Sequence, residues 1–424
     1  MSANLPGWYA QGRPHLWLRY TQMKTANPPL AVERTDGTRI ILADGRELID
    51  GIASWWTAAH GYNHPHIRAS VERQLQALPH VMLGGLVHEQ AMVLATRLAN
   101  LLPDGLDHVF FSDSGSVAVE IAMKIAVQYW LNRGQTGRTR FVAFKGGYHG
   151  DTFAAMSVCD PEEGMHALFG GVVPAQHILD LPREEESEAA LQACLERHAD
   201  TIAGVIVEPL VQGAGGMIFN DEACMKRLRR AADAYDLVLI FDEIFTGFAR
   251  TGPMFACETS EVSPDIITLG KALSGGTLPL AATIATRKIF DSFQSDDPSR
   301  ALMHGPTFMG NALACAAANA SLDLFESEPR SLQAAEIAKK LTLGLGPCIE
   351  LAGVKDVRVR GATGVVELER IDDLEALKRR FVEAGVWIRP FRNIVYLTPA
   401  LTIGDGDLEI LTGTVFDVLK TTRT

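Results

Sequence analysis

Six short apolar runs between residues 106 and 286 constrain the fold of this chain more than any other feature of its sequence. Helical patterns separate most of these runs. Strands that are apolar on both faces are typical of a parallel sheet covered by helices. We therefore predict an α/β domain with a mostly parallel central sheet. The runs are HVFFSD, RFVAF, TIAGVIVEP, LVLIFDE, DIITLG and AATIAT.

The pattern changes after residue 310, where long Ala- and Leu-rich helical stretches begin. Four short strand patterns follow, VRVRG, GVVELE, VWIRPF and NIVYLTP, with a helix predicted near 372–384. Such a mixture is typical of a smaller α+β domain. We expect three regions: an N-terminal segment over 1–60 that contributes to the small domain and the functional site, a large domain over 61–310, and the small domain over 311–424.

Charge and cysteine content exclude several classes of protein. The chain has 39 Lys and Arg against 51 Asp and Glu, a net charge of −12, which disfavours binding to nucleic acid or anionic lipid. The six cysteines are far apart and form no C-x-x-C pair, so we predict reduced, mostly buried thiols and no metal site. We find no leader pattern and no apolar stretch long enough to span a bilayer, and we expect a cytoplasmic protein.

Polar residues follow several of the predicted strands at the point where ligands bind in open α/β sheets. Residues 112–116 follow the first run and begin a helix whose free N–H groups suit a phosphate, although such a turn is also an ordinary helix cap. Asp242 and Glu243 end a run that should be wholly buried. Because an unpaired buried carboxylate costs several kcal/mol, each of them needs a partner.

Lys271 follows the run DIITLG, and a glycine-rich turn with Tyr148 follows the run RFVAF. A partly desolvated amine at a strand end is a good nucleophile, whereas a lysine with a solvated head group is the plain alternative. Taken together, a phosphate cradle, an aromatic ring, a buried acid and an amine are the parts of a pyridoxal phosphate (PLP) site. Lys271 would then form the Schiff base and move the proton, and Asp242 would keep the pyridine nitrogen protonated.

Four motifs occur in an order and spacing that resemble the class-III aminotransferases of PLP fold type I: EPLVQGAGGM, DEIFTGFARTG, TLGKALSGG and HGPTFMGN. The resemblance covers nearly the whole chain. It implies a homodimer with two shared sites and PLP bound to Lys271, with Asp242 on the pyridine nitrogen. It further implies roles for the following residues: Gly115 and Ser116 at the PLP phosphate, Tyr148 at the ring and the substrate, Pro306 and Thr307 at the phosphate of the neighbouring subunit's cofactor, and Gly305, Tyr20, Trp55 and Arg389 at the substrate.

Further motifs narrow the resemblance to family members that act in biotin synthesis, namely DGIASWWTAAHGYNHP, DSGSVAVEIAMKIAVQYW, GYHGDTFAAMSVCDP and GVWIRPF. This implies transfer of an amino group from S-adenosylmethionine to 8-amino-7-oxononanoate, giving 7,8-diaminononanoate. The alternative is another class-III ω-aminotransferase that uses a diamine or ω-amino acid with pyruvate or 2-oxoglutarate. The chain departs from the family pattern at Leu18 and Arg19, where His-Pro commonly precedes the tyrosine, and after Pro399, where an aromatic residue often follows.

Overall fold

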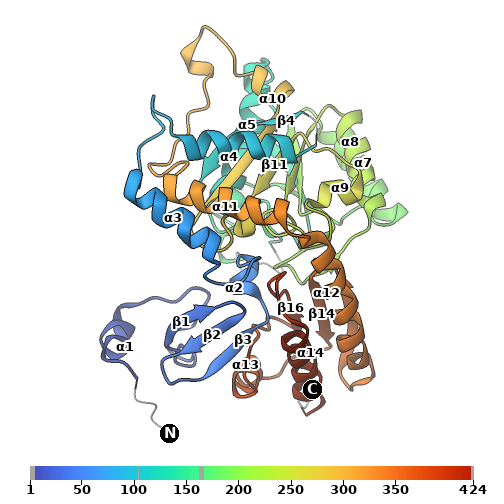
Figure 1. Cartoon of the computed structure of the whole chain (residues 1–424). Coiled ribbons are helices and arrows are strands. Elements are labelled where there is room, and N and C mark those ends of the chain that lie inside the picture. Colours follow the sequence, from blue (N-terminus) through green and yellow to red (C-terminus); the bar gives the residue numbers. More distant parts are fainter. Residues whose placement is uncertain (1–4, 104, 162–166, 422–424) are drawn as a thin grey trace. The chain divides into compact units, whose positions relative to one another are not determined.

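A computed structural model describes residues 5–103, 105–161 and 167–421 (Figure 1). The chain divides into two compact units. One comprises Met1–His64 together with Leu332–Thr424, and the other comprises Pro65–Ser331. In the described part of the chain, no helix is both long enough and apolar enough to cross a membrane.

The unit Pro65–Ser331 is built on a seven-stranded sheet with the order β4-β12-β11-β10-β7-β5-β6. Only β12 runs antiparallel to its neighbours, β4 and β11. The mostly parallel α/β sheet predicted from the apolar runs is therefore confirmed. Its strands are β4 (Leu106–Ser112), β5 (Arg140–Phe144), β6 (His177–Leu179), β7 (Ile202–Val207), β10 (Val238–Asp242), β11 (Ile266–Leu269) and β12 (Ala281–Thr286).

Helices cover this sheet, and their sequences reflect how deeply each is buried. The helix α5 packs across β4, β12, β11, β10 and β7 and is apolar around most of its circumference, whereas α8 is amphipathic and packs one face on β7 and β10. Figure 1 shows α11 running beside α3 and α4. The helices of this unit are α3 (Pro65–Ala77), α4 (Glu89–Leu101), α5 (Gly115–Asn132), α6 (Phe153–Ser157), α7 (Glu185–His198), α8 (Glu222–Ala234), α9 (Ala256–Ser260), α10 (Arg287–Asp291) and α11 (Ala312–Ser327); α12 (Arg330–Leu345) begins here, and β8 (Val211–Gln212) pairs with β9 (Ile218–Phe219).

The strand register places several polar residues at one edge of the sheet. Asp242 of β10 lies opposite Thr268 of β11, and Ser112 of β4 lies opposite Ala281 of β12. Since β4, β10 and β11 are parallel, the chain segments that follow them leave the sheet at the same edge. This is the edge at which ligands bind in α/β folds.

The other unit contains a four-stranded sheet with the order β1-β2-β3-β15 and a three-stranded sheet with the order β13-β14-β16. The four strand patterns and the helix predicted after residue 350 form β13 to β16 and α13. The elements of this unit are α1 (Gly7–Gly12), β1 (Val32–Asp36), β2 (Arg39–Leu42), β3 (Glu47–Asp50), α2 (Ala53–Trp56), β13 (Val354–Arg360), β14 (Thr363–Leu368), α13 (Leu374–Glu383), β15 (Val386–Trp387), β16 (Ile394–Leu397) and α14 (Asp405–Lys420).

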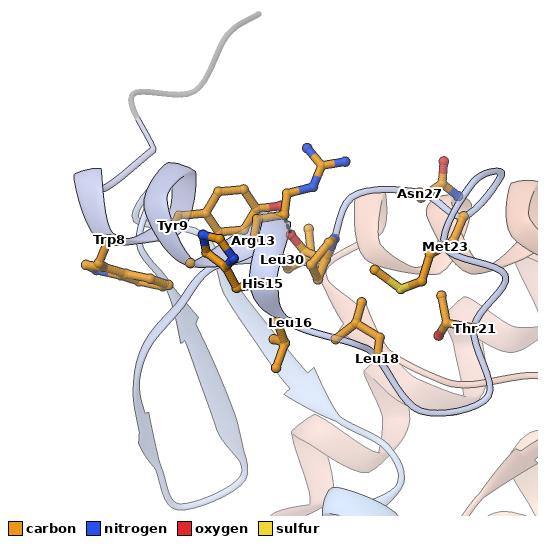
Figure 2. Close-up of a pocket in the computed structure, with 13 residues that line it drawn as sticks. Trp8, Tyr9, Arg13, His15, Leu16, Leu18, Thr21, Met23, Asn27 and Leu30 are labelled. Carbon is orange, nitrogen blue, oxygen red and sulfur yellow. Dashed lines mark hydrogen bonds between the residues drawn. The ribbon is translucent and has the colours of Figure 1, made fainter.

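The N-terminal arm before β1 folds back on itself around a mainly apolar pocket of about 500 Å³ (Figure 2). The Tyr9 hydroxyl donates a hydrogen bond to the Pro29 carbonyl at 2.7 Å and so closes the arm into a loop. Several large apolar side chains of the arm face solvent, Trp17 being 87% exposed and Trp8 56%. So much exposed apolar surface in one segment is typical of a region that contacts another molecule.

Candidate active site

Lys271 lies at the carboxyl edge of the sheet in a strained backbone conformation. Gly270 follows β11, and Lys271 then begins a short 3-10 turn (Lys271–Ser274) with a φ of 45°. The left-handed region costs a residue other than glycine on the order of 1–3 kcal/mol, and such strain concentrates at functional sites. The backbone conformation that holds Lys271 at this edge therefore reduces the stability of the folded chain.

Asp242 is buried at the end of β10 and is hydrogen-bonded on both oxygens. Its Oδ1 accepts from the Ile244 N–H at 3.1 Å and from the Thr268 hydroxyl at 3.2 Å, and its Oδ2 lies 2.7 Å from His149 Nδ1. A carboxylate has about four acceptor sites. Among the residues that the structure describes, these three donors leave one site on Oδ2 for a further donor.

His149 is wholly buried beside Asp242. Burial alone lowers the pKa of His149, but its hydrogen bond to Asp242 and the negative charge of that residue outweigh burial and leave the pKa raised. The imidazole therefore carries a proton on Nδ1, and this N–H donates a hydrogen bond to the Asp242 carboxylate. Sequence reasoning assigned no role to His149, although its position directly after Tyr148 in a strand-end turn was a signal.

The N-terminus of α5 faces the same edge. Ser114 caps the helix by accepting a hydrogen bond from the Val117 N–H at 3.3 Å. The first-turn N–H groups of Gly115 and Ser116 have no acceptor within the helix, and the helix dipole favours an anion there. A Cβ at Gly115 would lie 2.9 Å from the Ile244 side chain, and one at Gly270 would lie 3.4 Å from it. Ile244 therefore packs between the helix N-terminus and the backbone that leads into Lys271.

The glycine-rich turn that contains Tyr148 is locked against α5. Gly150 has a φ of +124°, and a Cβ there would lie 2.3 Å from the Ser116 Oγ, so only glycine fits. The same Oγ accepts from the Thr152 N–H at 2.9 Å. The Tyr148 hydroxyl donates to Asp151 at 2.8 Å. These contacts fix the turn that contains Tyr148 next to the N-terminus of α5.

Glu208 is a second buried carboxylate of this region, and sequence reasoning missed it although it ends the run TIAGVIVEP. It accepts hydrogen bonds from the Tyr148 N–H at 2.9 Å and the Gly213 N–H at 3.0 Å. Burial raises the pKa of Glu208 to about 7, even though the charge of His149 and the two backbone N–H groups lower it. Glu208 thus positions the backbone of Tyr148.

The raised pKa of Glu208 predicts a pH dependence of stability. The folded chain binds the proton more tightly than the unfolded chain, so this stabilisation is fully present below the ordinary glutamate pKa of 4.5 and is lost as the pH rises through about 7. We expect the Tm of Glu208→Gln to fall less than the wild-type Tm over this interval, measured by thermal denaturation. Glu72→Gln, on the exposed face of α3, is the control and should behave as wild type; equal slopes for all three proteins would contradict the prediction.

In the other unit, Trp55 belongs to a left-handed turn. All four residues of Ala53–Trp56 have φ values between 44° and 71°. Left-handed backbone costs roughly 1–2 kcal/mol per residue. Buried Asp50 holds the turn, because its carboxylate accepts two backbone N–H groups at 2.8 Å and the Tyr62 hydroxyl at 2.6 Å. The backbone of the turn that carries Trp55 is therefore energetically unfavourable, and the hydrogen bonds of Asp50 stabilise it.

Tyr20 and Trp55 both lie against Arg19, a residue that sequence reasoning noted only as a departure from the family pattern. The Arg19 guanidinium carbon lies 3.8 Å from the centroid of the Trp55 ring and 5.2 Å from that of Tyr20. The guanidinium of Arg389 lies 5.7 Å from the same Trp55 ring. Arg389 and Tyr20 also line a cavity of about 550 Å³ within this unit.

The segment that contains Gly305, Pro306 and Thr307 lies on the surface. Gly305 and Thr307 are exposed. The Met303 carbonyl, two residues before Gly305, accepts a hydrogen bond from Lys124 at 3.0 Å. Lys124 lies about 13 Å along α5 from the helix N-terminus. These residues are not among those that surround Asp242 in the same chain.

Metal ligands do not gather anywhere in the described residues: no group of three or more His, Cys, Asp or Glu could hold an ion there. All six cysteines are free thiols, and five of them are buried. The buried thiol of Cys159 has its pKa raised by burial to about 12. We assign the cysteines no chemical role.

Comparisons with known proteins identify the family to which the chain belongs. The family model described as Aminotransferase class-III matches residues 20–419. The adenosylmethionine-8-amino-7-oxononanoate aminotransferase of Buchnera aphidicola subsp. Acyrthosiphon pisum is 42% identical over 96% of this chain and 97% of its own. The crystal structure of the protein of that name from Methanocaldococcus jannaschii is 34% identical, with a TM-score of 0.92 over 97% of this chain and 98% of its own. An amine transaminase from an uncultivated Pseudomonas species is 32% identical, with a TM-score of 0.89 over 95% and 98% of the two chains. The chain belongs to the class-III aminotransferase family.

Proposed function

We propose that this chain transfers an amino group from S-adenosylmethionine to 8-amino-7-oxononanoate, with PLP as its cofactor. The observation that supports the chemistry best is the arrangement of Lys271, buried Asp242 and the free N-terminus of α5 along one edge of the sheet. The choice of substrates is supported by the names of the Buchnera and Methanocaldococcus relatives.

The residues at the sheet edge fit PLP. The α5 N-terminus offers N–H groups and a positive dipole to the phosphate dianion. The remaining acceptor site on Asp242 Oδ2 suits a protonated ring nitrogen, and Tyr148 offers an aromatic face. Lys271 supplies the amine that would hold the cofactor covalently. When bound, PLP supplies an electron sink for the negative charge that forms at the substrate carbon.

Each residue then has a distinct task. Lys271 would move the proton from the substrate carbon, and its backbone at the end of β11 would hold its side chain at the reacting centre. Asp242, supported by the His149 proton, would stabilise positive charge on the ring nitrogen. Glu208, through the backbone of Tyr148, would hold the aromatic ring in place.

For the carboxylate of 8-amino-7-oxononanoate we propose Arg389 as a ligand, because a guanidinium offers a planar fork of donors. Tyr20 and Trp55 would contact the apolar chain and the cationic parts of the substrates. A second candidate function is transamination of a diamine or ω-amino acid with pyruvate or 2-oxoglutarate. Its support is the likeness to the amine transaminase from the uncultivated Pseudomonas species.

A half-reaction screen tests the proposal and separates the two candidates. The purified, cofactor-loaded protein is mixed with one amine at a time, and the visible absorbance of the cofactor is followed. S-adenosylmethionine should convert the cofactor to its amino form, and 8-amino-7-oxononanoate should convert it back. Conversion by a diamine or an ω-amino acid, but not by S-adenosylmethionine, would favour the second candidate instead.

We further propose a homodimer in which Pro306 and Thr307 reach the cofactor of the neighbouring subunit. Support comes from an exposed apolar patch where two segments pack together. The rings of His80 and Phe308 lie 4.6 Å apart, and a Cβ at Gly310 would lie 2.7 Å from Leu83. A patch of this kind is typical of an association surface. Its exposed side chains are Met82, Leu86, Val87, Met303 and Phe308.

Phe308→Glu should weaken this dimer, because it places a charge in the middle of the apolar patch. We expect the variant to elute as a monomer at micromolar concentration in size-exclusion chromatography with light scattering, and to lose PLP more readily. Leu168→Glu, at a side chain that is 93% exposed elsewhere in the same unit, is the matched control and should stay dimeric. A monomeric wild-type protein would contradict the proposal.

A further inference from the structure

Two guanidinium groups lie against one indole ring. Arg19 stacks at 3.8 Å from the centroid of Trp55, and Arg389 lies 5.7 Å from it. Arg389 also lies 5.6 Å from the Trp387 ring. All of these residues belong to the same compact unit. The turn that presents Trp55 is fixed by Asp50, whose carboxylate accepts hydrogen bonds from the Ile52 and Ser54 N–H groups at 2.8 Å. The ring is therefore a rigid platform for two cations.

Neither cation has an acidic partner in the described part of the chain, where no ion pair to Arg19 or Arg389 is found within 4.0 Å. The charge of Arg389 does act on Glu375, but the carboxylate of Glu375 already has other partners. Its oxygens accept hydrogen bonds from Lys378 at 2.8 Å and from Asn27 at 2.9 Å. The lowered pKa of Glu375 comes first from Lys378, with only a smaller part from Arg389. Among the residues that the structure describes, no acid thus neutralises the positive charge at Trp55.

Two like charges that lie within 6 Å of one indole ring repel each other, and an anion bound between them relieves that repulsion. Stacking on the indole leaves the edge of a guanidinium, with its N–H donors, free to bind a ligand. A carboxylate is the anion whose geometry matches such a fork. The cavity of about 550 Å³ that Arg389 and Tyr20 line offers room for the attached carbon chain.

We propose that Arg19 is a second carboxylate-binding residue, which acts together with Arg389 on the platform of Trp55 and selects substrates that end in a carboxylate. The proposal rests on the proposed function for the identity of the substrate. It differs from that function in assigning specificity to Arg19, a residue that neither the sequence motifs nor the named relatives single out. The competing explanation is that Arg19 only packs on Trp55 and holds its ring.

An equilibrium experiment separates these explanations without any turnover. Octanoate and 1-octanol are titrated by calorimetry into the cofactor-loaded wild-type protein, Arg19→Ala, Arg19→Lys and Arg34→Ala. Arg34 is an exposed arginine of β1 in the same unit and is the matched control. We expect Arg19→Ala to weaken octanoate binding by roughly ten- to a hundredfold, as loss of a charged hydrogen bond implies, and to leave octanol binding unchanged. Arg19→Lys should restore part of the affinity, and Arg34→Ala should match wild type.

Equal losses for octanoate and octanol in Arg19→Ala would assign Arg19 to the packing of Trp55 and would overturn the proposal. Unchanged octanoate binding in Arg19→Ala, or no octanoate binding by wild type, would overturn it as well.

A kinetic experiment links the result to the reaction. For Arg19→Ala, the KM for 8-amino-7-oxononanoate should rise about tenfold or more with kcat little changed, and the KM for its methyl ester should stay at the wild-type value. If wild type fails to use S-adenosylmethionine with 8-amino-7-oxononanoate, the proposed function fails, while the octanoate titration still decides the role of Arg19. A fall in kcat with an unchanged KM would count against the role in carboxylate binding.

Discussion

Lys271→Ala should reduce the rate of amino transfer by about a thousandfold or more and abolish covalent retention of PLP. Loss of a group that forms a covalent bond to the cofactor and moves a proton removes two contributions to the rate at once. The measurements are single-turnover rates with S-adenosylmethionine and borohydride trapping followed by peptide mass spectrometry. In wild type, the trapped cofactor should be found on the peptide that contains Lys271 and on no other lysine.

The strained backbone of Lys271 provides a control that separates chemistry from folding. Glycine adopts a φ of 45° without the penalty that other residues pay, so Lys271→Gly should be as stable as wild type or more stable by about 1 kcal/mol. It should nevertheless be as inactive as Lys271→Ala. Lys288→Ala, at an exposed lysine of α10 in the same unit, should keep wild-type activity. Trapped cofactor in either Lys271 variant would refute the assignment.

Six of the seven strands of the large sheet were predictable because burial on both faces leaves a strong signal in the sequence. The seventh, β6, was not predicted; it is short and only half-buried, so it leaves no such signal. Each of the runs near Ile202, Val238 and Ile266 consists of apolar residues without alternation, and each forms a strand of the sheet. The direction of β12 was not predictable. Its run, AATIAT, is as apolar as the runs that form parallel strands. Only its pairing with Ser112 and Thr268 shows that it is antiparallel to its neighbours. Strand direction depends on the connection between strands, which local composition does not encode.

The candidate site was predictable where a polar residue ends an apolar run, as Asp242 and Lys271 do. It was not predictable where the feature depends on contacts between distant parts of the chain. His149 and Asp242 are separated by 93 residues in the sequence, and the left-handed turn that holds Trp55 depends on Asp50 and Tyr62 together. Backbone strain of this kind is maintained by the surrounding structure, so the conformational preferences of the local residues do not predict it.

Asp242→Asn should fold and bind PLP but slow the proton-transfer step by at least about a hundredfold, the usual cost of removing one preorganised electrostatic contact at a reacting centre. The amide cannot supply negative charge to the ring nitrogen. It also changes the contact with His149, because the residue that faces the imidazole at 2.7 Å loses its charge. Single-turnover rates with S-adenosylmethionine, measured together with the affinity for PLP, distinguish slower chemistry from weaker binding.

Thr268→Val is the matched control for this prediction, since it removes a single neutral donor to Asp242 Oδ1 and preserves the shape of the side chain. A neutral hydrogen bond contributes about 1 kcal/mol, so this variant should remain within roughly tenfold of the wild-type rate. The large effect of Asp242→Asn and the small effect of Thr268→Val would together show that the charge of Asp242, rather than the hydrogen-bonded packing around it, drives the reaction. If Asp242→Asn also stays within about tenfold, which corresponds to roughly 1.4 kcal/mol of barrier, another group must stabilise the charge on the ring.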